Sequence, residues 1–298
     1  MRKLTTEKRA MVIRCLVEGN SIRSTVRMTG VSKKAVTKLL VDLGRVCAEY
    51  QDRTFRNLKL SNLQCDEIWS FVGSKEKNVP AQSKGQYGRG DVWTWTAIDR
   101  DTKLIPCWRV GLRNADDAAL FIDVLAGRLL GTPQITTDGL KVYISAIKES
   151  FGEFVDYAQL VKIYGLPEAG TEARYSPSRI IGAEMHRISG EPDPKQVCTS
   201  HVERQNLTMR MGMRRFTRLT NGFSKKVENH EAAIAVHFMY YNFARIHQTL
   251  RVTPAMAAGV TDHAWEIEDV IALLDAAEAE AVEAGKLKRG KYQPRNSK

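Results

Sequence analysis

The sequence lacks any long apolar segment. No run approaches the roughly 18 consecutive apolar residues that a membrane-spanning helix needs, and the opening residues 1–6 are polar. These absences exclude the usual signature of a membrane protein. We therefore expect a soluble, cytoplasmic protein with no membrane partner.

Cysteine is also scarce. Disulfide frameworks need paired cysteines, and zinc modules need closely spaced ones. The cysteines here are odd in number, widely scattered and never in a CxxC pair, so neither feature is expected. They are Cys15, Cys47, Cys65, Cys107 and Cys198. We interpret them as structural thiols in a reducing compartment.

Positive charge, by contrast, is abundant and concentrated near the N-terminus. Lys and Arg total 45 against 34 Asp and Glu, a formal net charge of +11. Residues 1–45 alone carry 11 basic and 3 acidic residues (11 − 3 = +8), which is most of that excess. Such a charge suits a polyanionic partner, and we favour nucleic acid over an acidic membrane.

Residues 1–46 show three short helical patterns. Thr5 or Thr6 can cap the first, which Gly19 ends, and Ser32 can cap the third, which Gly44 ends. The predicted helices are therefore 5–18, 21–28 and 32–43. Three short helices with a glycine-containing turn indicate a helix-turn-helix domain.

The third predicted helix carries basic side chains on its outward face. Lys33, Lys34, Thr37 and Lys38 lie near its N-terminal end, the part that a recognition helix places in the major groove of DNA. They are our candidate base and phosphate contacts. The alternative is a basic helix that is merely solvated.

After a predicted polar connector at 45–57, the pattern changes from helical to extended. Strand and helix signals then alternate in the order β-β-β-α-β-α-β. The predicted strands are 63–72, 92–98, 104–110, 134–137 and 155–163, and the predicted helices are 116–130, with Asn114 as N-cap, and 143–151. This order predicts an α/β fold with a ribonuclease-H-like mixed sheet and flanking helices.

The remaining chain divides into an insertion, two helices and a tail. Proline-rich residues 166–198 predict a long, partly ordered insertion, and helical patterns return at 200–213 and 225–246. We place the catalytic domain at 58–258. In the tail, 259–298, an amphipathic helix could form a dimer contact, and the basic residues 286–298 suggest a phosphate-binding end.

Three carboxylates occupy positions suited to metal-dependent chemistry. Asp66 lies inside a predicted strand, where Asp is disfavoured unless it has a role. Asp138 follows the strand 134–137, and Glu203 is the only acid among seven basic residues from 203 to 226. Each has an ordinary alternative: a solvated edge-strand Asp, an Asp-Gly turn and a salt-bridged Glu.

Cleaving or joining DNA backbones requires cations at the scissile phosphate, and Asp and Glu oxygens hold Mg2+ (or Mn2+). Three carboxylates suffice for the two ions of the two-metal scheme. The rival acids rank second because Glu67 faces away from Asp66, and Asp99 and Asp101 are explained by a turn.

Basic residues beside Glu203 suggest DNA contacts. Arg210 returns to the face of Glu203 two helical turns on and could hold a phosphate, or could be surface charge. Arg214 belongs to the same basic run and is a further candidate. We expect His201 to be a DNA contact or a solvated side chain, not a metal ligand.

Several fragments resemble transposases of the insertion-sequence-one family. They are Asp66-Glu67-Ile68-Trp69-Ser70-Phe71, Thr137-Asp138-Gly139, the run from His201 to Arg210 and the run from Tyr241 to Pro254. The resemblance implies a DDE enzyme that nicks the ends of a mobile element and joins the freed 3′-hydroxyl to target DNA. Asp66, Asp138 and Glu203 fall on the three acid positions, and Arg210 falls where related enzymes place a Lys or Arg.

The resemblance makes a DNA transposase the leading hypothesis. The partners would be double-stranded DNA, as terminal repeats and as target, and a second copy of the chain in a dimer or larger assembly at the nucleoid. Some family members begin with a cysteine zinc finger that this chain lacks. A catalytically silent DNA-binding regulator and a structure-selective nuclease of the same fold remain the alternatives.

Overall fold

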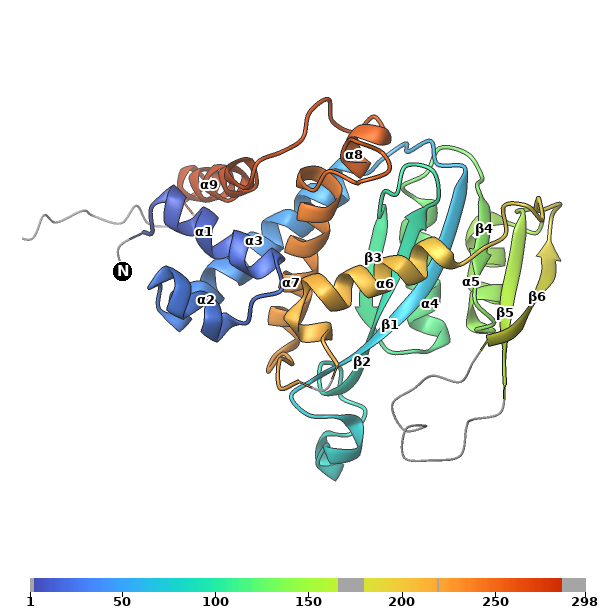
Figure 1. The fold of residues 1–298 in the computed structure, drawn as a ribbon, viewed down its shortest axis with the longest axis horizontal. Helices are drawn as coiled ribbons and strands as arrows, with labels where there is room; N and C mark the ends of the chain where they lie inside the picture. Colours follow the sequence, from blue (N-terminus) through green and yellow to red (C-terminus); the bar gives the residue numbers. More distant parts are fainter. Residues whose placement is uncertain (1–2, 166–179, 219, 286–298) are drawn as a thin grey trace, which may run out of the picture.

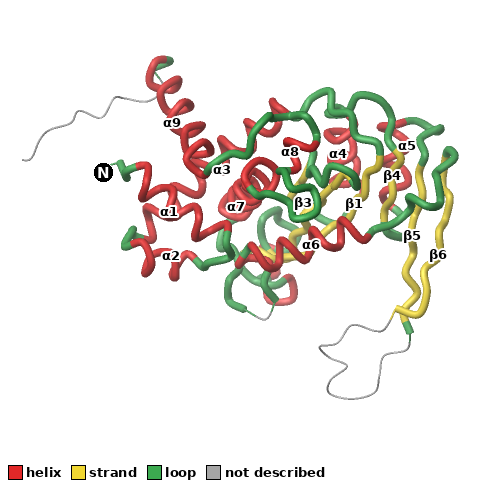
Figure 2. The backbone as a smooth tube through the Cα atoms, turned by 45° about the horizontal axis from the view of Figure 1, so that its top comes forward, coloured by secondary structure: helices red, strands yellow, loops and turns green. Residues whose placement is uncertain are grey.

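The computed structural model describes residues 3–165, 180–218 and 220–285. A group of helices lies beside a mixed sheet (Figures 1 and 2). One apolar core runs through both. The strands are β1 Asn62–Val72, β2 Gly90–Asp99, β3 Cys107–Gly111, β4 Gln134–Thr137, β5 Tyr157–Tyr164 and β6 Ile180–Ser189. The longer helices are α1 Thr6–Val17, α2 Ile22–Thr29, α3 Lys33–Thr54, α4 Ala115–Ala126, α5 Val142–Phe151, α6 Ser200–Gly212, α7 Val227–Met239 and α9 Ile267–Glu283. The short ones are α8 Pro254–Ala257, 3-10 turns at Glu76–Asn78, Ala81–Ser83 and Arg214–Phe216 (η4), and a π-helical turn at Tyr240–Ala244 (η5).

The six strands form one sheet in the order β3-β2-β1-β4-β5-β6. β1, β2 and β3 make an antiparallel meander, β1, β4 and β5 are parallel neighbours, and β6 returns antiparallel to β5. This confirms the predicted α/β fold with a ribonuclease-H-like mixed sheet flanked by helices. β1 lies inside the sheet, so both of its edges are hydrogen-bonded to neighbouring strands, β2 and β4.

The two faces of β1 meet different helices because successive side chains alternate (Figure 1). Gln64 points toward α6, where its amide oxygen accepts the backbone N–H groups of His201 (2.9 Å) and Val202 (3.2 Å). On the other face, Tyr143 of α5 donates to Glu67. The alternation therefore assigns even-numbered residues of this part of β1 to α6 and odd-numbered ones to α5.

The N-terminal helices begin where their caps predict. The side chains of Thr5 and Ser32 accept the backbone N–H groups of Lys8 and Ala35, at the starts of α1 and α3. However, the predicted end of the third helix at Gly44 is wrong, because α3 continues to Thr54. The predicted boundary at residue 46 therefore lies inside a helix, and most of the predicted connector 45–57 is helical.

Packing explains why Gly44 does not end the helix. A Cβ atom at this position would lie 2.5 Å from the Cα of Ala232, so the missing side chain lets α3 approach α7 closely. The packing of α3 against α7 stabilises the helix by more than the intrinsic penalty of about 1 kcal/mol for glycine in a helix. The consequence is that α3 links the helix-turn-helix rigidly to the rest of the chain.

We predict that Gly44→Ala lowers the free energy of unfolding by roughly 1–3 kcal/mol, because the added methyl overpacks the contact between α3 and α7. Urea unfolding measures this difference. Gly127→Ala at the end of α4 is the matched control, since its Cβ would meet no atom closer than 3.6 Å. Equal losses in both variants would contradict the close helix contact.

Part of the predicted insertion is a regular strand. Residues 180–189 form β6, which pairs with β5, while residues 166–179 lie outside the described part of the chain. The insertion predicted as partly ordered across 166–198 therefore contains a regular strand that the sequence analysis did not identify. Most of its side chains are exposed, as an edge strand allows, so it lacks the apolar alternation by which strands are found.

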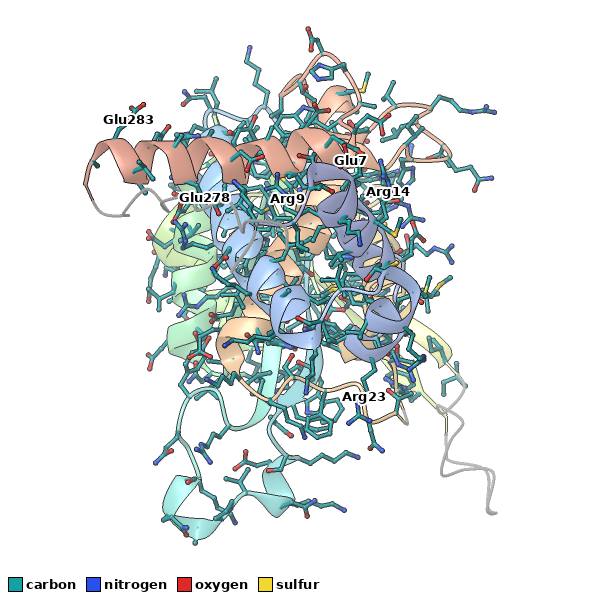
Figure 3. The ribbon with its side chains drawn as sticks, turned by 90° about the vertical axis from the view of Figure 1, so that its left-hand side faces the viewer. Glu7, Arg9, Arg14, Arg23, Glu278 and Glu283 are labelled. Carbon is teal, nitrogen blue, oxygen red and sulfur yellow. The ribbon has the colours of Figure 1, made fainter. Side chains whose placement is uncertain are left out.

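The tail helix α9 packs within its own chain. Its apolar residues Val270 and Ile271 are buried, and Arg9 of α1 forms a two-pronged ion pair with Asp275 at 2.8 Å. Figure 3 shows α9 lying across the N-terminal helices, with Arg9 beside it. Because α1 and α3 cover this face, it is not free for the dimer contact that the sequence left open. The basic residues 286–298 lie outside the described residues. Across the described ranges, no helix has the length and apolar character to cross a bilayer.

Candidate active site

Asp66 and Asp138 lie side by side because their strands are parallel neighbours. Cys65 of β1 is in register with Thr137 of β4, and each Asp is the next residue along its strand. Since β1 is an interior strand, Asp66 is not the solvated edge-strand residue of the alternative interpretation. Asp138 also serves the turn after β4, where its carboxylate accepts the N–H of Leu140 at 3.0 Å.

Glu67 joins these two acids, which the sequence analysis did not predict. One ligand oxygen from each of Asp66, Glu67 and Asp138 lies within 4.8 Å of the others. The Glu67 side chain does face away from α6, as alternation requires, and only 1% of it is exposed. Asp138, at the end of β4, nevertheless lies close to both Asp66 and Glu67. The prediction that Glu67 ranks behind the other acids is therefore wrong as far as its position is concerned. The adjacent pair of acids within one strand was the available signal.

Two residues from other elements hold Glu67. The Nε atom of Arg113 donates to its carboxylate at 2.6 Å, and the hydroxyl of Tyr143 donates at 3.2 Å. The guanidinium of Arg113 also lies over the Trp93 ring, 4.8 Å from its centroid. Arg113 is therefore fixed by a carboxylate and an aromatic ring at the edge of the acid group.

The acid group is electrostatically crowded. Burial, followed by the nearby charges of Glu67 and Asp138, raises the pKa of Asp66 to about 7. Burial and Asp138 likewise raise the pKa of Glu67 to about 7, although Arg113 opposes that shift. Carboxylates this close disfavour being ionised together, and a divalent cation between their oxygens would offset the repulsion. The donor set therefore fits a hard metal ion.

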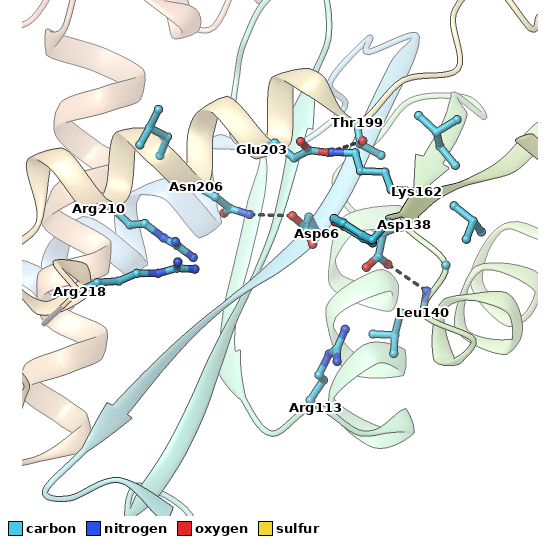
Figure 4. A pocket seen from close by; sticks show the side chains of 15 residues that line it. Asp66, Arg113, Asp138, Leu140, Lys162, Thr199, Glu203, Asn206, Arg210 and Arg218 are labelled. Carbon is cyan, nitrogen blue, oxygen red and sulfur yellow. Dashed lines mark hydrogen bonds and ion pairs between the residues drawn. The ribbon is translucent and has the colours of Figure 1, made fainter. Parts of the chain in front are cut away.

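Asn206 of α6 orients Asp66. Its side-chain amide donates to the Asp66 carboxylate at 2.8 Å (Figure 4). The backbone N–H of Glu67 donates to the other oxygen at 2.8 Å. Sequence reasoning missed Asn206. It stands three residues after Glu203, on the same helical face, which was the signal that could have identified it.

Glu203 lies one turn into α6, facing the same cavity but outside the acid group. Its carboxylate accepts a hydrogen bond from the Thr199 hydroxyl at 2.5 Å and forms an ion pair with Lys162 of β5 (Figure 4). The salt-bridge alternative is thus the arrangement present in the structure. Even so, the charge of Glu203 is near enough to contribute to the raised pKa of Asp66.

A cavity of about 660 Å³ contains the carboxylates and is rimmed by cations. Arg210 lines it, as the sequence predicts, and so does Arg218, while Arg214 in η4 is not among its lining residues. Burial and the neighbouring Arg218 lower the pKa of Arg210. The cavity thus combines carboxylates with four surrounding cations, Arg113, Lys162, Arg210 and Arg218. This combination suits a ligand that binds both a metal ion and cations, such as a phosphodiester.

The predicted DNA-reading residues lie together on α3. Lys33, Lys34, Thr37 and Lys38 line one shallow depression with Val41 and Asp42. The three lysines are exposed, and Lys38 forms an ion pair with Asp42 one turn later. The arrangement leaves a basic surface at the start of α3, as a recognition helix requires. Whether it contacts DNA stays a prediction.

Comparison with protein-family models and with curated proteins gives no match for this chain.

Proposed function

We propose that the protein is a DNA transposase that cleaves element ends and joins them to target DNA in a metal-dependent reaction. The observation that carries the proposal is the cavity in which Asp66, Asp138 and Glu203 meet a rim of basic residues. The ribonuclease-H-like sheet supports it, although this fold hosts many functions. The fragments that resemble insertion-sequence-one transposases include all three acids.

Asp66, Asp138 and Glu203 would hold Mg2+ (or Mn2+), with Glu67 beside the two aspartates and two ions expected. The chemistry that such ions would supply is activation of water or a 3′-hydroxyl and stabilisation of the leaving oxygen. Asn206 keeps the Asp66 carboxylate turned toward the cavity. Arg210 and Arg218 would bind non-bridging phosphate oxygens and so orient the strand.

Two further parts of the proposal concern partners. The basic start of α3 would recognise terminal repeats in double-stranded DNA, with Lys33, Lys34, Thr37 and Lys38 as contacts. Because two element ends must be brought together for joining, we propose that the active form is a dimer or larger assembly. The nucleoid is then its place of action.

The test uses a labelled duplex that carries the DNA flanking the gene. With Mg2+ the natural protein should cut one strand and join the freed end to a second duplex. Asp138→Asn should lose both steps by about a thousandfold, since metal-held charge stabilisation is worth several kcal/mol, yet keep DNA binding. Lys148→Gln, on the exposed surface of α5, is the control and should behave as the natural protein.

Each other outcome favours a different function. Cutting without joining would favour the structure-selective nuclease. Binding without any cutting would favour the DNA-binding regulator. An Asp138→Asn variant as active as the natural protein would show that this cavity is not the catalytic site.

A further inference from the structure

A second groove runs along α6 on a face that does not line the acid cavity. Two cavities, of about 420 and 320 Å³, share Arg204, Thr208, Tyr241 and Arg245, so they form one continuous depression, which we call the α6–η5 groove. None of the α6 residues that line it also lines the acid cavity. One end lies at Lys103, and the other reaches Val17 and Glu18, where α1 ends.

The groove is strongly basic. Lys103, Arg204 and Arg245 line its larger cavity together with His201 and His247, and no acidic residue lines that cavity. Among the ion pairs of the described residues, none involves Lys103, Arg204 or Arg245. Some opposing interactions are present, because the Lys103 ammonium donates to the Arg100 carbonyl, Asp99 and Asp101 lie near it, and Glu18 lines the smaller cavity. The cations that line the larger cavity still repel one another, which an anionic ligand would relieve.

Buried polar groups in the groove walls also lack partners. The residue Gln205 is 2% exposed and His237 is 3% exposed. Among the described residues, no hydrogen-bond partner reaches the side-chain nitrogen of Gln205 or either ring nitrogen of His237. Both residues line the groove. The Gln205 amide nitrogen is an unpaired donor. Burial lowers the pKa of His237 to about 3, so its ring is neutral and has one donor and one acceptor nitrogen. Unpaired buried polar groups are unfavourable, and a ligand with acceptor oxygens would relieve the two donors if these side chains turned into the groove.

Two of the cations in the groove, Lys103 and Arg245, lie in or next to an unusual backbone conformation. Lys103 has φ +60°, a left-handed conformation that a non-glycine residue adopts only when its surroundings impose it. Arg245 follows the π-helical turn η5, whose wide turn is closed by the Arg245 N–H donating to the Tyr240 carbonyl at 2.8 Å. Turns of this kind are frequently found at functional sites.

We propose that the α6–η5 groove binds the sugar-phosphate backbone of a DNA strand, with Lys103, Arg204 and Arg245 contacting successive phosphates. The groove is elongated and ends beside the helix-turn-helix, which a strand can follow and a single small anion cannot fill. The inference rests on the proposed function, because it adds a second DNA contact to the same enzyme. The acid cavity and the groove would hold DNA on two faces of α6.

Fluorescence anisotropy with a labelled duplex, measured without Mg2+ over a series of salt concentrations, tests the groove. Lys103→Gln and Arg245→Gln should each weaken binding about tenfold, and each should reduce the slope of log affinity against log salt by about one, since one phosphate contact is lost. The loss should be equal for element-end and unrelated sequences. Lys148→Gln removes the same charge from α5 and should match the natural protein.

Arg245→Lys distinguishes a loss of charge from a loss of folding. It keeps the positive charge, so it should retain most of the affinity that Arg245→Gln loses. If Lys103→Gln and Arg245→Gln keep natural affinity and slope, or if Arg245→Lys is as weak as Arg245→Gln, the groove does not bind phosphates. If the natural protein never cleaves DNA but its binding still depends on Lys103 and Arg245, the proposed transposase function is wrong and the proposed groove stands. If the natural protein cleaves DNA and the groove variants bind normally, the proposed function stands and the proposed groove is wrong.

Discussion

Asp66→Asn is expected to stabilise the protein while abolishing strand cleavage. Burial, followed by the charges of Glu67, Asp138 and Glu203, raises the pKa of Asp66 to about 7, so the ionised carboxylate is unfavourable in the folded state. Replacing it with an amide of the same shape removes that penalty. The new amide oxygen can still accept the N–H of Glu67, and Asn206, whose side-chain oxygen has no partner in the described structure, can turn its amide to accept from the new NH2 group. We expect the free energy of unfolding to rise by roughly 2–4 kcal/mol at about pH 8, from a shift of about three pKa units.

The sign of the pH dependence follows from the direction of this shift. Above about pH 7 the carboxylate is ionised in both the folded and unfolded states, so the whole penalty is present. Between about pH 7 and pH 4 the folded protein retains a proton that the unfolded chain has lost, and the penalty fades. The advantage of Asp66→Asn should therefore shrink steadily as the pH falls. Urea unfolding in EDTA at several pH values measures it.

Asp99→Asn is the matched comparison for this effect. Asp99 is also buried, but its carboxylate accepts the N–H groups of Asp101 and Thr102 and the Thr102 hydroxyl in the turn after β2. The amide would replace an acceptor with a donor there, so this variant should be less stable than the natural protein. Loss of stability in Asp66→Asn at about pH 8 would contradict the crowded acid group.

The second large effect concerns Glu203. Glu203→Gln should lower cleavage and joining by about a thousandfold, because a metal-held carboxylate contributes several kcal/mol to the transition state. The free energy of unfolding should change by less than about 1 kcal/mol, since the ion pair with Lys162 is partly exposed. Single-turnover cleavage and urea unfolding of the same preparation give both numbers.

Glu67→Gln is the comparison that makes this prediction decisive. The structure offers two candidates for the third acid: Glu203, paired with Lys162 at the cavity wall, and Glu67, within 4.8 Å of the other two acids. If Glu203→Gln remains active and Glu67→Gln does not, Glu203 is a salt-bridge residue and the acid triad is Asp66, Glu67 and Asp138. The proposed reaction would stand with a different ligand set.

Local interactions explain what could be predicted from the sequence. Helix caps such as Thr5, Ser32 and Asn114 bond to backbone atoms three residues away, so a short segment contains the whole signal. Strand order also followed from local patterns, and with it the meeting of Asp66 and Asp138 at the end of β4. For this reason the ribonuclease-H-like fold and two of the acids could be predicted from the sequence.

Tertiary structure decided the features that depend on distant partners. Gly44 looks like a helix end until Ala232 packs against it, and β6 is recognisable only beside β5. Glu67 becomes a candidate ligand through Asp138, and Glu203 is paired through Lys162. The groove between α6 and η5 joins residues more than a hundred positions apart. The sequence determined the elements and their order; only folding decided which charges would meet, because electrostatic contact depends on distance in space and not along the chain.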